Sequence, residues 1–146
     1  MANLITQAGA DRVLTVDLHS PQIQGFFDIP LDHLYAAPVM MAYFQTLAMQ
    51  DAMLVAPDAG AVKMGRAFAK RLDADLAIVD KRRTAPDQSE AVTIIGDVRG
   101  RDCIIMDDLI STAGTICNAA ATLKEDGAKR VTACASHGVF SGLRHH

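Results

Sequence analysis

The sequence predicts an α/β fold, a mostly parallel sheet with helices on both faces. Short runs of β-branched and aliphatic residues alternate with longer segments in which apolar residues recur at helical intervals. Half of the 146 residues are apolar and 21% are charged, which suits one folded core better than two independent domains or a disordered chain. In such a fold the crossovers are right-handed, and ligands bind beyond the carboxyl ends of the strands.

Six short apolar runs, bounded by polar or turn-forming residues, predict strands. They cover residues 13–16, 53–56, 76–79, 92–95, 103–106 and 131–135. We expect the first to be a buried strand, and the run at 103–106 is apolar enough for a central parallel strand. No helix separates the third and fourth runs, and the polar residues between them predict a mobile loop, so this pair predicts a β-hairpin flap.

Three segments show the spacing of amphipathic helices. They run from Pro38 to about residue 48, over residues 61–72, and from Thr115 to about residue 126. In the second segment Phe68 and Leu72 are expected to face inward. The third stops at Gly127, a residue type that favours helix C-termini. The stretch from residue 21 to residue 30 predicts a loop instead, because Pro begins and ends it.

Composition argues against several classes of partner and location. The chain has 14 Lys and Arg against 17 Asp and Glu, a net charge of −3, so it lacks the broad positive field of nonspecific nucleic-acid or membrane-surface binding. No apolar run is long enough for a membrane helix and no export signal precedes the first strand, which favours a cytoplasmic location. Cys103, Cys117 and Cys134 are widely spaced within apolar stretches and predict buried, reduced thiols.

Ionisable residues follow four of the predicted strands. They are Asp17 and His19, Asp58, Lys81 and Arg83, and Asp107 with Asp108. Because the carboxyl ends of parallel strands meet at one edge of a sheet, these side chains are expected to gather there. Asp28, Asp32 and His33, by contrast, are interpreted as solvated turn residues.

The strongest local signal lies between the fifth strand and the third helix. The strand is expected to stop at two carboxylates, and hydroxyl-bearing and small residues then turn into the helix N-terminus, where free amides and the helix dipole favour an anion. The residues concerned are Asp107, Asp108, Ser111, Thr112, Ala113, Gly114 and Thr115. The carboxylates can accept hydrogen bonds from vicinal sugar hydroxyls, so the segment predicts a sugar-phosphate site. The plainer alternative is a capped helix after two solvated acids.

This segment resembles the phosphoribosyl-diphosphate binding motif shared by type I phosphoribosyltransferases and ribose-phosphate diphosphokinases. Four further stretches, residues 12–28, 56–60, 80–83 and 96–102, resemble the diphosphokinase signatures. The resemblance implies a type I phosphoribosyltransferase-like (Rossmann-like) fold. It also implies transfer of the diphosphoryl group of ATP to the C1 hydroxyl of ribose 5-phosphate, which yields phosphoribosyl diphosphate and AMP for nucleotide biosynthesis.

Roles for individual residues follow from the same resemblance. Lys81 and Arg83 match the catalytic pair that binds the transferring phosphoryl group, and the sugar-phosphate segment matches the ribose 5-phosphate site. His19 and Asp58 match the positions that hold Mg²⁺, as an incomplete site that the phosphates of ATP complete. The plainer interpretations stay open, namely a solvated basic cluster for the first pair and a structural hydrogen bond for the histidine. ATP, ribose 5-phosphate and further copies of the chain are the expected partners.

The sequence departs from the family in two respects. Ser111 stands where the widespread bacterial form has Asp, and Ala113 where Gly is frequent, so allosteric behaviour is not implied. Family members also have a preceding domain that helps to hold the adenine of ATP, and further elements beyond residue 142. We therefore expect a fragment with weak or no activity: residues 1–34 a remnant of that domain, 35–142 the catalytic portion and 143–146 the remnant of a tag. The first strand is expected to dock differently or to pair with another copy.

Two other functions compete with this one. A phosphoribosyltransferase would use the same sugar-phosphate segment but would need a hood that recognises a nitrogen base, and the sequence shows no such element. A noncatalytic synthetase-associated module would bind sugar phosphate or assemble with active subunits. Such proteins usually lose the catalytic residues that this sequence keeps.

Overall fold

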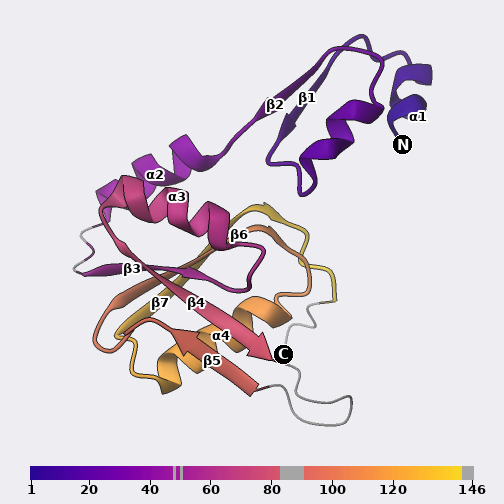
Figure 1. Cartoon of the computed structure of the whole chain (residues 1–146). Coiled ribbons are helices and arrows are strands. Elements are labelled where there is room, and N and C mark those ends of the chain that lie inside the picture. Colours follow the sequence, from indigo (N-terminus) through magenta and orange to yellow (C-terminus); the bar gives the residue numbers. More distant parts are fainter. Residues whose placement is uncertain (48, 50, 83–90, 143–146) are drawn as a thin grey trace.

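The chain forms a layered body and a smaller arm that projects from it (Figure 1). The structure is a computed structural model and describes residues 1–47, 49, 51–82 and 91–142. We call residues 1–34 the arm and the described residues from 37 to 142 the body. Figure 1 shows the arm extending away from the sheet, on the side where two helices of the body lie.

The body is built on a five-stranded sheet in the order β5-β4-β3-β6-β7. Four of its strands are parallel, and β5 pairs antiparallel with β4. The strands are β3 (Ala52–Ala56), β4 (Asp75–Arg82), β5 (Ala91–Ile95), β6 (Asp102–Ile110) and β7 (Arg130–Gly138). The predicted mostly parallel sheet and the hairpin are therefore confirmed, whereas the loop predicted at 84–90 lies outside the described residues.

Helices cover both faces of this sheet, as predicted. On one face α2 (Ala37–Thr46) and α3 (Val62–Leu72) enclose a core with Leu54 of β3 and Ile104 of β6. On the other face α4 (Gly114–Glu125) packs over Val55 and Ile105. Neighbouring residues of one strand thus enter opposite cores, because side chains alternate across a pleated sheet. Phe68 is 3% exposed, and Leu72 packs against the same core, as expected.

The arm corrects the sequence interpretation of the first 34 residues. It contains α1 (Ala2–Gln7), β1 (Val13–Val16), the 3-10 helix η1 (Pro21–Phe26) and β2 (Leu31–Leu34). Among the strands that the structure describes, β1 pairs with β2 alone, in parallel. The prediction of a buried first strand is wrong, because a two-stranded sheet offers no second layer: Leu14 is 63% exposed. Asp32 and His33 lie in β2 rather than in a turn, and the predicted loop contains η1.

A second correction concerns the end of β6. The acidic pair Asp107 and Asp108 lies inside this strand, which continues to Ile110 because β7 runs alongside it as far as Gly138. The pairing of β3 with β6 ends earlier, at Ile105, so β6 and β7 continue as a two-stranded ribbon past β3. The apolar run at 103–106 therefore predicted the end of this strand too early.

Two further observations concern the burial of the cysteines and the length of the helices. All three cysteines are free thiols, but only Cys103 is buried, whereas Cys134 is partly buried and Cys117 is exposed. Cys117 is exposed because α4 turns it away from the core face formed by Ile116 and Leu123. None of the helices in the described ranges has the length and apolarity needed to cross a membrane.

Candidate functional site

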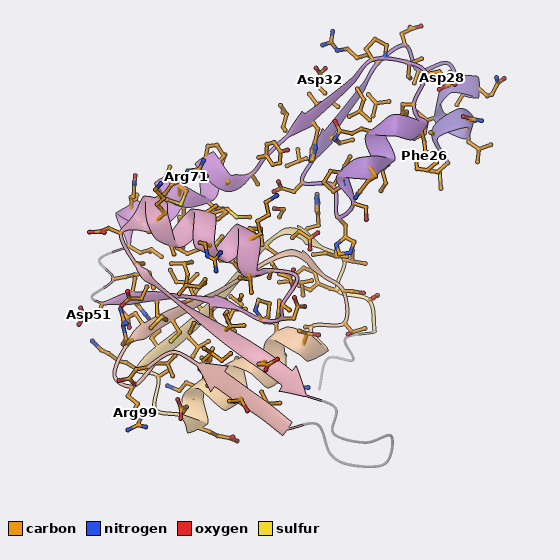
Figure 2. The ribbon with its side chains drawn as sticks, in the orientation of Figure 1. Phe26, Asp28, Asp32, Asp51, Arg71 and Arg99 are labelled. Carbon is orange, nitrogen blue, oxygen red and sulfur yellow. The ribbon has the colours of Figure 1, made fainter. Side chains whose placement is uncertain are left out.

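Four of the predicted site residues, His19, Asp58, Asp107 and Asp108, lie together where the arm joins the body. His19, beyond the end of β1, places its Nδ1 atom 2.7 Å from Oδ2 of Asp108 on β6. Asp58, at the end of β3, accepts a hydrogen bond at Oδ1 from the backbone N–H of Ala61, 3.1 Å away, just before α3. Asp28 and Asp32 stay on the arm, away from this junction (Figure 2).

The two neighbouring carboxyl groups of β6 have opposite pKa shifts. Burial, followed by the hydrogen bond with Asp108, raises the pKa of Asp107 to about 6. Burial acts in the same direction on Asp108, but hydrogen bonds with His19 and Asp107 outweigh it and lower the pKa of Asp108. Because like charges this close oppose joint ionisation, Asp108 ionises first as the pH rises, and Asp107 loses its proton only as the pH passes about 6. The backbone N–H of Asp108 also donates to Oδ1 of Asp107 at 2.9 Å.

His19 is exposed although it takes part in this cluster. Its side chain is 77% exposed. The hydrogen bond and charge of Asp108 raise its pKa, with further contributions from Asp107 and Asp58. Within the described ranges no three His, Cys, Asp or Glu side chains are arranged to hold a metal ion. A cation at His19 and Asp58 would therefore need ligands from a substrate or from water.

The predicted sugar-phosphate turn lies at the start of α4, which begins at Gly114, one residue before the predicted start at Thr115. The residue with left-handed backbone is Ala113, whose φ is 64°, rather than the glycine after it. Ser111, Thr112 and Thr115 are exposed. The hydroxyl oxygens of Ser111 and Ser141 lie 3.0 Å apart, which links the turn to the chain beyond β7. The turn thus presents hydroxyls and the first amides of a helix to solvent.

A cavity of about 1260 Å³ lies between the base of the arm and α2 and α3. Its lining includes four of the predicted residues, and α2 and α3 contribute both apolar and charged side chains. The polar lining includes Asp17, His19, Asp58, Asp107 and Asp108, and the apolar lining includes Met40, Met41, Met64 and Phe68. Of the turn residues 111–115, none lines this cavity.

The predicted catalytic pair is only partly described. Lys81 lies in β4, where its backbone pairs with Val92 of β5. Arg83 lies outside the described residues. The catalytic prediction at these two positions stays a prediction.

Sequence reasoning missed three contacts of the junction. The carboxylate of Asp17 accepts hydrogen bonds from the hydroxyl of Ser136 and from the backbone N–H of Ala36. The Nε2 atom of His137 lies 2.7 Å from the carbonyl oxygen of Val16. The one available signal was that Ser136 and His137 are polar residues following an apolar run, at the carboxyl end of a parallel strand.

Comparisons with known proteins show which family the sequence matches. Residues 37–146 match the family described as the phosphoribosyl transferase domain. The chain is similar to ribose-phosphate pyrophosphokinases, with 58% identity to the Gloeobacter violaceus protein over 97% of this chain and 57% identity to that of Clostridium acetobutylicum over 97%. It covers 43% and 45% of these relatives, so it spans less than half of their length.

The chain is also similar to solved structures. A phosphoribosylpyrophosphate synthetase from Mycobacterium smegmatis superposes with a TM-score of 0.84 and 44% identity, covering 96% of this chain and 45% of that one. A purine phosphoribosyltransferase from Pyrococcus horikoshii superposes with a TM-score of 0.61 at 17% identity, over 92% of this chain and 83% of its own. The second likeness establishes the fold alone.

Proposed function

Because the chain belongs to the phosphoribosyl transferase domain family, we propose that it forms the sugar-phosphate half of a ribose-phosphate diphosphokinase. The reaction moves the diphosphoryl group of ATP to the C1 hydroxyl of ribose 5-phosphate and releases AMP. A homo-oligomer in the cytoplasm and a division of the chain after residue 34 belong to the same proposal. The high identity with pyrophosphokinases supports this reaction over that of the phosphoribosyltransferases.

The observation that carries the proposal is the run from the acidic pair to the start of α4. Asp108, whose pKa is lowered, is a charged acceptor for sugar hydroxyls. The exposed turn from Ser111 to Thr115 offers hydroxyl donors and helix amides to a phosphate ester. The hydroxyl groups of a pentose phosphate would thus meet hydrogen-bond acceptors, and its phosphate would meet hydrogen-bond donors.

The diphosphoryl group would be held by cations and by the metal. Lys81 and Arg83 are assigned to the transferring phosphoryl oxygens, where positive charge offsets the charge that develops during transfer. His19 and Asp58 would hold Mg²⁺, and the donor set fits a site completed by nucleotide, since both residues line the cavity and one oxygen of Asp58 is left for a ligand. When bound, Mg²⁺ offsets the charge on the phosphates of ATP.

Two measurements on the chain test the proposal. Calorimetry should detect binding of ribose 5-phosphate and much weaker binding of ribose, because the phosphate is held by the turn. Incubation with ATP, Mg²⁺ and ribose 5-phosphate should then yield AMP, even if slowly. A chain that binds the sugar phosphate without producing AMP is the expected sugar-phosphate half without turnover. A chain that binds no ribose 5-phosphate, or binds ribose and ribose 5-phosphate equally, contradicts the proposed site.

A further inference from the structure

The arm is attached to the body through one short segment. Among the described residues, each hydrogen bond between arm and body involves the segment 16–19, which we call the joint. One partner, Ala36, lies in the link between arm and body just before α2, and the others lie on the body: Asp108 in β6, and Ser136 and His137 in β7. The position of His19 therefore depends on what fixes the joint.

Asp17 is the centre of these contacts. Its φ of 43° lies in the left-handed region, which short polar residues tolerate better than most others. Its Oδ2 atom accepts one hydrogen bond from the N–H of Ala36 at 3.1 Å and another from the hydroxyl of Ser136. The turn that leads to His19 is thus held from two sides, by the start of α2 and by the end of β7.

His137 secures the backbone of the same turn. Its Nε2 atom lies 2.7 Å from the carbonyl oxygen of Val16 and 3.2 Å from that of Asp17. Carbonyl oxygens only accept hydrogen bonds, so Nε2 carries the proton and donates. Because His137 and Ser136 are both half-buried, these bonds compete less with water than bonds at the surface do.

The contact made by His19 itself is a poor anchor. Its imidazole is 77% exposed, and exposed ion pairs contribute little to holding a chain in place. We propose that Ser136 and His137 are positioning residues, which fix the joint and thereby keep the imidazole of His19 beside Asp108. The inference rests on the proposed function only for the role of His19, whereas the attachment of the joint is tested without substrate.

The test is NMR relaxation of the backbone amides of Leu18 and His19. In the parent chain their order parameters should be those of rigid backbone, about 0.85, and in Ser136→Ala combined with His137→Leu they should fall below about 0.6. Ser136→Thr and His137→Gln keep a donor at each position and should restore order. Ser20→Ala removes a neighbouring hydroxyl that makes no capping hydrogen bond and serves as the matched control.

The results separate positioning from general stabilisation. The proposal is supported if the order parameters fall only at residues 16–19 of the double variant and return when Thr and Gln are placed at these positions. If the double variant does not fold, the same loss in Ser136→Ala alone supports it. Unchanged order in Ser136→Ala and His137→Leu, or an equal loss in Ser20→Ala, overturns it. Failure of the proposed function would show instead as absent ribose 5-phosphate binding by the parent chain, so the two failures are distinguishable.

Discussion

The arm and the body use similar apolar strands with opposite results. Leu54 in β3 is 0% exposed, whereas Leu14 in β1 is 63% exposed. The body covers its sheet with helices on both faces, whereas the arm has two strands and two short helices, and none of its residues belongs to either core. Burial therefore depends on the layers around a strand rather than on the strand's own sequence. The body supplies the stability of the molecule, and the arm depends on polar contacts for its position.

The largest expected effect separates the stability of the two regions. Leu54→Ala should lower the free energy of unfolding by about 3 kcal/mol, because it leaves a cavity in a closed core. Leu14→Ala should change it by less than about 0.5 kcal/mol, because the side chain is already in water. Urea denaturation of both variants measures the difference. Equal losses of unfolding free energy in the two variants would show that β1 is covered in solution, and the contrast between arm and body would then be wrong.

The next effect concerns catalysis by a residue of the body. Lys81→Ala should slow AMP formation by about a hundredfold in a protein that contains this chain and turns over, with the affinity for ribose 5-phosphate unchanged. The lysine is assigned to the transferring group, which is charged most strongly in the transition state. The measurement is steady-state kinetics with calorimetry, and turnover near the parental rate would remove Lys81 from the mechanism.

A smaller effect tests whether the sugar site belongs to the body alone. Asp108→Ala should weaken ribose 5-phosphate binding by about tenfold, because it removes a charged acceptor for the sugar hydroxyls. Asp126→Ala, at the far end of α4, is the matched control, and Leu14→Ala in the arm should also leave the affinity unchanged. Calorimetry gives the three dissociation constants, and an unchanged value for Asp108→Ala would contradict the assigned role.

The last effect is a pH dependence of stability that arises in the body. The pKa of Asp107 is raised from 3.8 to about 6, so the folded chain holds a proton that the unfolded chain releases. Its contribution to stability is present below pH 3.8 and is lost as the pH rises through about 6. Asp107→Asn should remove this component from urea unfolding curves measured across that range. If Asp107→Asn and the control Asp126→Asn give the same pH dependence as the parent, Asp107 ionises normally.

The sequence predicted the body better than the arm for a physical reason. Runs such as 53–56 and 103–106 are apolar throughout because both faces of their strands are buried. The length of β6 was not predictable in this way, since Asp107 continues the strand only because Ala135 pairs with it. The run at 13–16 has the same β-branched character, and nothing in it indicates that it lies outside the main sheet.

Much of the candidate site was also predictable. The convergence of Asp58 and the acidic pair follows from parallel strands that run side by side in one sheet. His19 reaches the same cavity from β1, which lies outside that sheet, so the premise of its prediction was wrong although its position was expected. Ser136 was missed because its role depends on Asp17, 119 residues away in sequence. No local pattern records a contact of that kind. The proposed binding roles still depend on the experiments above.

The ribbon formed by β6 and β7 beyond β3 carries a wider consequence. The acidic pair lies on a two-stranded extension of the sheet, and the turn follows at its end, beyond the part of β6 that is paired on both sides. Ile110 still packs against one core, whereas the exposed residues Ser111, Thr112 and Thr115 just after it contribute to neither core, so exchanges there should leave the folded body intact. The purine phosphoribosyltransferase keeps the same fold at 17% identity, so this fold tolerates wide change in sequence.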